Sequence, residues 1–306
     1  MRASLDRLLA FRDDVAPESL ICPHIPALGR GRDDEATSLA AEWFSYATRP
    51  EILDCVQVLV GPNIILWGSQ VFCKPAHTGR KIPWHQDGKY WPMRPLATVS
   101  AWIAIDDATP ANGNMRFIPG SHRDRRVIPH RVNHDPSLVL PEEAAPHAFD
   151  ESRARDDALR AGEFSLHDVF LIHGSEANQS DHRRAGFVAR YMPASAVFER
   201  GAADNVMQSA QGTIRVDYAT RPIWLLRGAD VSGRNDFTVG HDDSARTGDM
   251  SVTLSTTNPN SVTTPLSILG GNGLPQSATV TFPSNPGFNS ISFLLTASIC
   301  SSAGIA

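Results

Sequence analysis

Two histidines and an aspartate have the types and spacing that best suit metal chemistry in this sequence. His85 and Asp87 stand two apart, and His173 follows 86 residues after Asp87. Alternate side chains of a β-strand lie on one face, so a strand here would direct an imidazole and a carboxylate toward one point. Two histidines and one carboxylate on one face of an octahedral Fe(II) ion leave positions open for a co-substrate and O2.

An H-x-D pair alone is a weak signal, because a lone strand histidine is more often structural. Arg184 adds discrimination, since it follows His173 by eleven residues and we expect it to begin the strand after the one that His173 ends. A guanidinium binds a carboxylate in bidentate geometry, and Ser175 can donate a hydroxyl hydrogen bond to the same group. Iron with a dicarboxylic keto acid anchored by arginine is what a 2-oxoglutarate oxygenase needs. A surface salt bridge is the alternative for Arg184 and the stronger interpretation for Arg183.

The elements that must position these residues change in character near residue 64. Apolar stripes predict helices near residues 5–11 and 39–44, and Pro50 suits the start of a helix that continues over residues 51–60. Short runs rich in β-branched and aromatic residues predict strands at 64–73, 97–105, 115–118, 163–172 and 186–192. Many short strands without long intervening helices favour a sandwich or barrel. Residues 123–161 are expected to form a long loop with one helical turn.

Composition excludes several classes of protein. The chain has 306 residues, 42% hydrophobic and 20% charged, which is ordinary for a globular protein. A net charge of −5 provides no basic footprint for nucleic acid. The longest apolar run, 56–67, is interrupted by Gly-Pro-Asn and is too short to span a membrane. The four cysteines form no C-x-x-C pair, so we expect reduced thiols in a cytoplasmic protein. The N-terminus carries three aspartates and does not resemble a signal peptide.

The end of the chain differs from the rest. Residues 250–306 contain no Asp, Glu, Lys or Arg and are rich in Ser and Thr. We therefore predict a catalytic domain over 1–241, with N-terminal helices in about 3–60, followed by a charge-poor tail over 242–306 of unknown role.

Beyond these patterns, the chain resembles the phytanoyl-CoA dioxygenase (PhyH) family of Fe(II)/2-oxoglutarate oxygenases over residues 50–240. The similar stretches, in consistent order, are Gly61–Ile64, Lys74-Pro75, Trp84–Asp87, Tyr90–Pro92, Arg94-Pro95, Ala101-Trp102, Asn112-Gly113, Pro119–His122, His173–Ser175, Arg184 and Arg190-Tyr191. The resemblance implies a mainly β fold, a double-stranded β-helix (jelly-roll, cupin-like) barrel with flanking helices. The family usually begins with a strand before the first helix, which we expect to be missing here, and the tail has no counterpart in it.

The resemblance also implies roles for individual residues. It implies iron ligation by the set His85, Asp87 and His173. It implies that Arg184 and Ser175 hold the distal carboxylate of 2-oxoglutarate, and that Trp102 and Gln70 line the co-substrate pocket, although Trp102 fits plain core packing equally well. A carboxylate at position 87 favours hydroxylation, or desaturation or another oxidative outcome, over halogenation, because related halogenases have a small residue there.

Four further residues are candidates for the substrate pocket. Trp84, Tyr90 and Trp91 flank the H-x-D motif, with core packing as the alternative. His167 stands six residues before His173, so strand alternation would place both on one face. We expect a small-molecule substrate and neither nucleic acid nor membrane as partner, while the oligomeric state and the substrate's identity stay open.

Two rival classes of function use the same residues. A non-catalytic jelly-roll protein could bind a metal or another ligand, and loss of Arg184 or of a metal ligand would have favoured it. A zinc hydrolase could use the same three ligands with a metal-bound water. That second reading leaves Arg184 and Ser175 without a role.

Overall fold

The structure is a computed structural model of the whole chain. It describes residues 1–202, 205–209, 212–241, 250–256, 263–269, 275–281 and 293–299. The chain divides into two compact units, Met1–Asn235 and Asp236–Ala306.

Three helices occupy the N-terminal region, as predicted. They are α1 (Arg2–Phe11), α2 (Asp33–Ala47) and α3 (Pro50–Val60). Pro50 takes the first position of α3, where its missing N–H leaves no hydrogen bond unmade. Gly61 ends α3 with a φ of 88°, a left-handed conformation that glycine adopts without strain. No helix in the described part of the chain combines the length and the apolar character needed to cross a bilayer.

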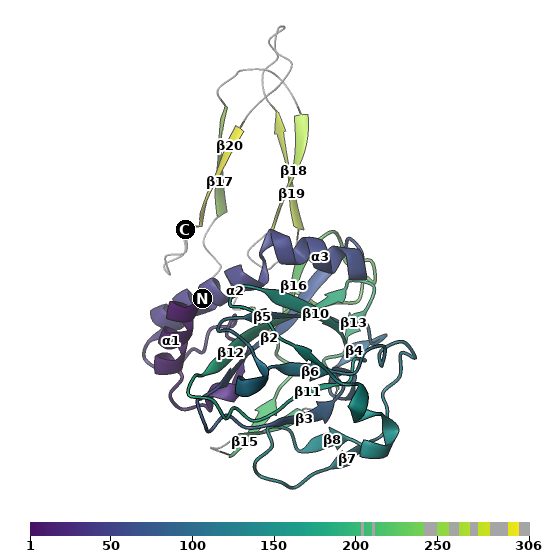
Figure 1. Ribbon diagram of the computed structural model, residues 1–306. Helices are drawn as coiled ribbons and strands as arrows, with labels where there is room; N and C mark the ends of the chain where they lie inside the picture. Colours follow the sequence, from purple (N-terminus) through teal and green to yellow (C-terminus); the bar gives the residue numbers. More distant parts are fainter. Residues whose placement is uncertain are drawn as a thin grey trace. The chain divides into compact units, whose positions relative to one another are not determined.

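A six-stranded antiparallel sheet forms one layer of the first unit (Figure 1). Its order is β1-β2-β12-β5-β10, and β16 also pairs with β2. The strands are β1 (Leu20–Ile21), β2 (Ile64–Lys74), β5 (Val99–Ala104), β10 (Phe164–Asp168), β12 (Arg184–Pro193) and β16 (Trp224–Arg227).

A second, four-stranded antiparallel sheet has the order β3-β11-β6-β9. Its strands are β3 (Ile82–His85), β6 (Met115–Phe117), β9 (Arg155–Asp157) and β11 (His173–Ser175). Smaller two-stranded pairs join β4 (Met93–Arg94) to β13 (Val197–Phe198), β7 (His130–Val132) to β8 (Glu142–Ala144), and β14 (Asn205–Ser209) to β15 (Gly212–Val216). Single 3-10 turns are η1 (Pro17–Ser19), η2 (Asp87–Lys89), η3 (Pro110–Asn112), η4 (Pro146–Ala148) and η5 (Glu151–Arg153).

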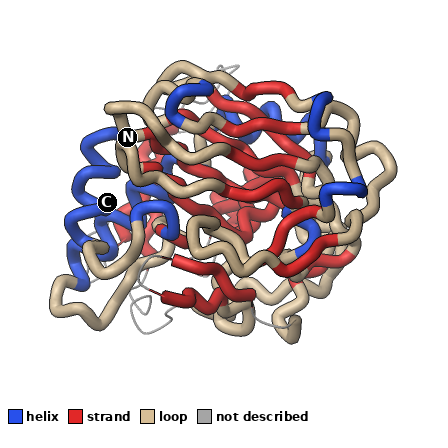
Figure 2. The backbone as a smooth tube through the Cα atoms, turned by 60° about the horizontal axis from the view of Figure 1, so that its bottom comes forward, coloured by secondary structure: helices blue, strands red, loops and turns tan. Residues whose placement is uncertain are grey.

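Successive side chains of β12 point alternately to the hydrophobic core and to the pocket between the sheets. Ala185, Phe187 and Tyr191 lie on the outer face and pack in one cluster with helix residues such as Trp43 and Val56. The helices therefore cover that face of the larger sheet (Figure 2). The intervening residues of β12 point to the other face, between the two sheets. This arrangement confirms the predicted mainly β jelly-roll with flanking helices.

The segment 123–161 differs from the expected loop. It contains the strands β7, β8 and β9 as well as the turns η4 and η5. Each of these strands has three residues, too few for an alternating hydrophobic pattern to be recognised in the sequence.

The second unit contains two strand pairs. β17 (Met250–Thr256) pairs with β20 (Phe293–Ile299), and β18 (Thr263–Leu269) pairs with β19 (Pro275–Thr281). Within the predicted tail, residues 242–249, 257–262, 270–274, 282–292 and 300–306 lie outside the described residues.

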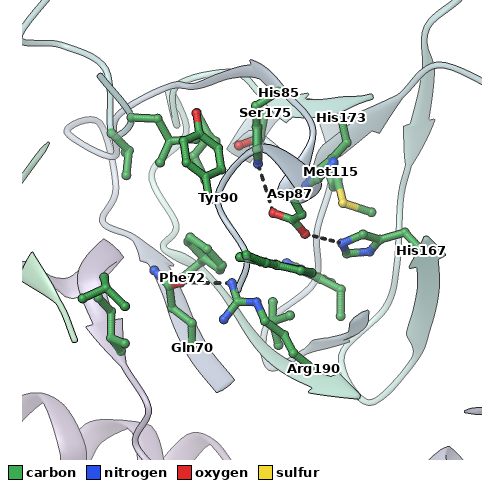
Figure 3. A pocket seen from close by; sticks show the side chains of 18 of the residues that line it. Gln70, Phe72, His85, Asp87, Tyr90, Met115, His167, His173, Ser175 and Arg190 are labelled. Carbon is green, nitrogen blue, oxygen red and sulfur yellow. Dashed lines mark hydrogen bonds and ion pairs between the residues drawn. The ribbon is translucent and has the colours of Figure 1, made fainter. Parts of the chain in front are cut away.

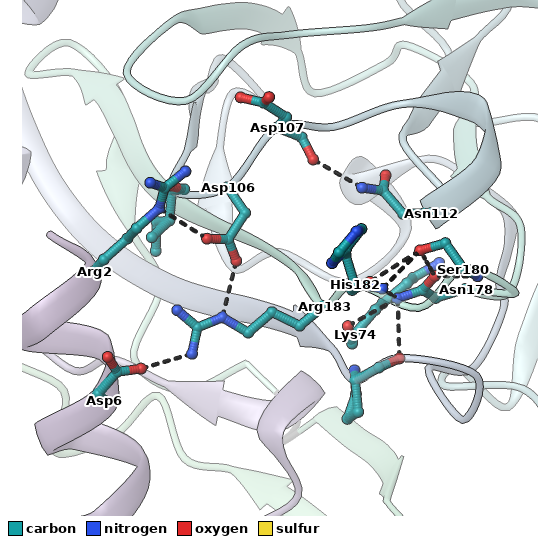
Figure 4. A network of polar contacts seen from close by, with 12 residues as sticks. Arg2, Asp6, Lys74, Asp106, Asp107, Asn112, Asn178, Ser180, His182 and Arg183 are labelled. Atoms are coloured by element: carbon teal, nitrogen blue, oxygen red, sulfur yellow. Dashed lines mark hydrogen bonds and ion pairs between the residues drawn. The ribbon is translucent and has the colours of Figure 1, made fainter.

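Arg183 connects helix α1 to the larger sheet (Figure 4). Its guanidinium contacts Asp6 of α1 at 2.6 Å and Asp106 after β5 at 2.9 Å, and Arg2 contacts Asp106 at 3.1 Å. Arg183 thus makes surface ion pairs, as predicted. Because consecutive strand residues face opposite sides, its neighbour Arg184 points between the sheets.

Gly186 of β12 offers a test of how tightly side chains pack on the cavity face of the larger sheet. A Cβ at this position would collide with the indole of Trp102 on β5. We expect Gly186→Ala to lower the free energy of unfolding by about 1–3 kcal/mol, because overpacking forces side chains off their rotamers. Urea unfolding measures this change. Gly68→Ala on β2 is the matched control, since its Cβ would lie at an ordinary 3.6 Å from its nearest neighbour; equal losses in both variants would contradict the prediction.

Candidate active site

His85, Asp87 and His173 form a buried cluster between the sheets. His85 ends β3 and His173 begins β11, and the two residues are directly paired across these antiparallel strands. Strand β3 stops before Asp87, which begins η2, but Gln86 keeps an extended backbone (φ −123°, ψ 130°). His85 and Asp87 therefore still share a face. One donor atom from each of the three residues lies within 4.8 Å of the others.

Backbone hydrogen bonds orient both imidazoles of the cluster. The Nδ1 of His85 lies 2.9 Å from the carbonyl oxygen of Pro83, and the Nδ1 of His173 lies 2.9 Å from that of Leu171. With Nδ1–H donating to a carbonyl, each neutral ring presents the lone pair of Nε2 to the pocket. This is the orientation that a second hydrogen bond commonly fixes for metal-binding histidines.

Asp87 and His173 of the cluster are in the protonation states that a bound cation requires. Burial alone would raise the pKa of Asp87, but contacts from His167 and His85 outweigh it and hold that pKa well below its usual value. The Nε2 atoms of His85 and His167 each lie 3.6 Å from a carboxylate oxygen of Asp87 (Figure 3). Burial, with a smaller effect of His85, lowers the pKa of His173 to about 3. Asp87 is thus an anion and His173 is neutral at neutral pH.

Arg184 is a buried cation that faces the same cavity. Its side chain is 2% exposed and lies over the ring of Trp102, with 5.5 Å from Cζ to the ring centroid. The Nη2 of Arg184 donates to the carbonyl oxygen of Gly113 at 2.7 Å, whereas its Nε has no hydrogen-bond partner among the described residues. Burial lowers the pKa of Arg184 to about 10, so it remains charged. Within the described residues no carboxylate lies within 4 Å of it, and this unmet charge suits an incoming carboxylate.

Lys74 supports Ser175 beside this guanidinium. Lys74 is paired directly with Arg184 across β2 and β12, and its Nζ donates to the Oγ of Ser175 at 2.7 Å and to the carbonyl oxygen of Glu176. Burial, together with the nearby Arg184 charge, lowers the pKa of Lys74 well below its usual value. Asn178 donates to the carbonyl oxygen of Lys74 at 3.2 Å (Figure 4). Sequence reasoning gave Lys74 no role, although a lysine that ends an apolar strand was a usable signal.

A single cavity, open to solvent and containing about 1020 Å³ of space, joins these groups. The structure places most of the sequence-predicted site residues on its wall: Gln70, His85, Asp87, Tyr90, Trp91, Trp102, His167, His173, Ser175 and Arg184. Their side chains thus share one space, with His85, Asp87, His167 and His173 converging at one end (Figure 3).

Trp84 lies away from the cavity. It packs with Ile118, Ile172 and Phe149 in a separate apolar cluster. Its neighbour His85 points into the cavity, so alternation along β3 directs Trp84 to the opposite face. Trp84 is therefore left out of the proposed substrate residues.

The strands that carry His167 and His173 differ from those expected from the sequence. His167 lies on β10 of the larger sheet and His173 on β11 of the smaller sheet, so they do not share a strand face. Their rings nevertheless meet with centroids 4.8 Å apart, because the chain crosses from one sheet to the other between them. His173 also begins its strand rather than ending one.

Arg190 and Arg221 also line the cavity and had no role in the sequence-based prediction. Arg190 follows Arg184 by six residues on the same strand, so period-two alternation was a signal that both point inward. Arg221 lies before β16, outside any strand, and no comparable pattern marks it.

Two facing antiparallel sheets with a buried His-Asp-His cluster define a non-haem iron oxygenase of the 2-oxoglutarate-dependent class. The phytanoyl-CoA dioxygenase (PhyH) family model matches residues 28–186, which is about half of the chain. The chain belongs to this family and is a dioxygenase.

Individual relatives agree with that assignment. The peroxisomal phytanoyl-CoA dioxygenase of Bos taurus is 29% identical over 239 residues, which cover 74% of this chain and 70% of that protein. A probable alpha-ketoglutarate-dependent hypophosphite dioxygenase of Stutzerimonas stutzeri is 29% identical over 154 residues, 50% of this chain and 53% of its own length. Among solved structures, the non-heme monooxygenase ThoJ in its apo form has a TM-score of 0.54 at 26% identity, covering 77% of this chain and 80% of that chain.

Proposed function

We propose that the protein hydroxylates a C–H bond of a small organic molecule, with His85, Asp87 and His173 holding Fe(II) and with Arg184 and Ser175 binding the distal carboxylate of 2-oxoglutarate. The observation that carries this proposal is the presence, in one cavity, of a preoriented metal-ligand set and a buried arginine that has no carboxylate partner among the described residues. The donor set of two imidazoles and one carboxylate fits a ferrous ion with open positions.

Bound Fe(II) and 2-oxoglutarate supply the oxidising chemistry: one atom of O2 enters the substrate as a hydroxyl group and the other enters succinate, with loss of CO2. The protein's own residues bind and orient. The charge of Arg184 attracts the far carboxylate, and the Nζ of Lys74 fixes the Ser175 hydroxyl beside it. The ring of Trp102 packs against one face of the Arg184 guanidinium and restricts its position. His167 contacts Asp87 and helps to keep it ionised.

The test of this function is succinate formation. We expect the protein, supplied with Fe(II), 2-oxoglutarate and O2, to release succinate at a rate that a true substrate in a metabolite panel stimulates. A chelator is expected to abolish the reaction, and Zn²⁺ is expected not to replace Fe(II).

Two outcomes would contradict the proposal. A hydrolytic activity that requires Zn²⁺ and no 2-oxoglutarate would favour a zinc hydrolase. Failure of the iron-loaded protein to bind 2-oxoglutarate in an anaerobic titration would favour a binding protein without this catalysis.

A further inference from the structure

The cavity contains a second basic region, distinct from Arg184. Arg184 and Arg190 are six residues apart on β12, which separates their Cα atoms by about 20 Å at the usual rise of a strand. One small carboxylate cannot contact both guanidiniums. Arg190 and Arg221 are therefore available for a different group, and both line the cavity.

Glycine on the neighbouring strand brings Arg190 and Arg221 together. Arg190 of β12 is paired with Gly68 of β2, and paired residues of antiparallel strands present their side chains on one face. Gly68 has no side chain, and an Nη atom of Arg221 lies 3.6 Å from the place where its Cβ would be. The guanidinium of Arg221 thus occupies the space beside Arg190 that a larger residue would fill.

Among the described residues, acidic groups act on these two arginines only from a distance: Asp87 on Arg190, and Asp217 on Arg221. In the part of the chain that the structure describes, neither guanidinium has a carboxylate oxygen within 4 Å, and the buried Nε of Arg190 has no hydrogen-bond partner. The Nη2 of Arg190 donates to the amide oxygen of Gln70 at 3.1 Å (Figure 3). Burial lowers the pKa of Arg190, Asp87 opposes this shift, and the charge of Arg221 adds to it. A buried guanidinium beside a second, partly exposed one is costly unless an anion joins them.

His24 also lies close enough to both arginines for their charges to affect its pKa. Burial lowers its pKa to about 3, with further contributions from Arg221 and then Arg190. Its Nδ1 lies 2.5 Å from the Oγ of Ser69. His24 is neutral, so it neither compensates the two positive charges nor competes for an anion.

Aromatic side chains surround the two guanidiniums. Arg190 lies over the ring of Trp91 at 5.2 Å and Arg221 over the ring of Tyr218 at 5.2 Å. Trp67 meets Trp91 edge-on, with ring centroids 4.8 Å apart. These flat contacts fix the guanidinium planes and leave an apolar wall for the rest of a ligand.

We propose that the substrate is an organic anion whose oxyanionic group, a carboxylate or a phosphorus oxyanion, binds between Arg190 and Arg221 while its apolar part extends along the aromatic wall toward Asp87. This inference rests on the proposed function and names the substrate class of that site. Guanidinium pairs recognise both kinds of oxyanion through parallel hydrogen bonds, so the test must separate them.

Binding of three ring compounds of matched size tests the inference. Benzoate, phenylphosphonate and neutral benzamide are titrated anaerobically into the Fe(II)-loaded protein, with and without saturating 2-oxoglutarate, and the quenching of tryptophan fluorescence is followed. We expect at least one anion to bind tenfold or more tightly than benzamide, and the better of the two identifies the oxyanion. Because 2-oxoglutarate occupies Arg184, we expect this preference to persist when it is saturating.

Charge-removing variants locate the binding. Arg190→Gln and Arg221→Gln are each expected to weaken the preferred anion tenfold or more while leaving benzamide unchanged. Arg234→Gln, an exposed arginine outside the cavity, is the matched control and should bind as the wild type does. Circular dichroism verifies folding, and the partly exposed Arg221 keeps the test decisive if Arg190→Gln does not fold.

Three results would overturn the inference: equal affinity for benzamide and both anions, an anion preference retained in the arginine variants, or complete displacement of the anion by 2-oxoglutarate. Failure of the proposed function is recognised separately. It would appear as loss of 2-oxoglutarate binding to the iron-loaded wild type, a measurement that does not involve Arg190 or Arg221.

Discussion

Replacing His85 by alanine is expected to lower 2-oxoglutarate turnover at least about 100-fold and to weaken Fe(II) binding by a similar factor. Loss of a partner that merely orients a metal ligand commonly costs 10- to 100-fold, and loss of a ligand costs more. The variant also removes one of the two imidazoles that contact the Asp87 carboxylate. Succinate formation and an equilibrium titration with Fe(II) measure the two effects.

His147→Ala provides the matched control. His147 is an exposed histidine of η4, away from the cavity, so it tests the removal of an imidazole without disturbing the cluster. We expect wild-type turnover and Fe(II) affinity in this variant. Normal turnover in His85→Ala would remove His85 from the proposed ligand set and would require another donor beside Asp87 and His173.

Replacing Arg184 by glutamine is expected to raise the concentration of 2-oxoglutarate needed for half-maximal turnover about 30- to 4,000-fold. Removing one member of a buried charge pair costs about 2–5 kcal/mol, and each 1.4 kcal/mol is a factor of ten. The guanidinium is 2% exposed, so water cannot take over its role with the carboxylate. A steady-state titration with 2-oxoglutarate measures the shift, and Fe(II) affinity should stay as in the wild type.

The neighbouring arginine separates this effect from a general loss of charge. Arg183→Gln removes ion pairs with Asp6 and Asp106 on the outer side of the sheet. We expect a small loss of stability and an unchanged requirement for 2-oxoglutarate. If the two variants behaved alike, Arg184 would be acting through the fold and the anchor of the co-substrate would lie elsewhere.

The sequence was informative where periodicity or spacing has a direct geometric meaning. Strand β12 alternates between helix-packed residues such as Phe187 and cavity residues such as Arg184, and the pattern of period two made this predictable. The helix start at Pro50 and the strand from Ile64 were predicted from equally local signals. The resemblance to a known family added the expectation that His85 and Asp87 meet the distant residues His173 and Arg184 in one site.

Long-range contacts were less accessible. The meeting of His167 with His173 depends on a chain crossing between two sheets, which no local pattern reports. Lys74 reaches Ser175 through the register of β2 and β12, and Arg221 enters the cavity beside Gly68; both features require the tertiary structure. The short strands of 123–161 were missed because three residues carry too little pattern.

The carbonyl bonds that set the ring orientation of His85 and His173 have a practical consequence for preparing the enzyme. Imidazole and carboxylate donors held in this orientation accept several divalent ions, and binding strength for such donors rises from Mn²⁺ through Fe²⁺ to Ni²⁺ and Cu²⁺. Nickel leaching from an affinity resin would therefore outcompete ferrous iron at these nitrogens. Purification without immobilised nickel, followed by reconstitution with excess ferrous salt under reducing conditions, is the preparation that this feature demands.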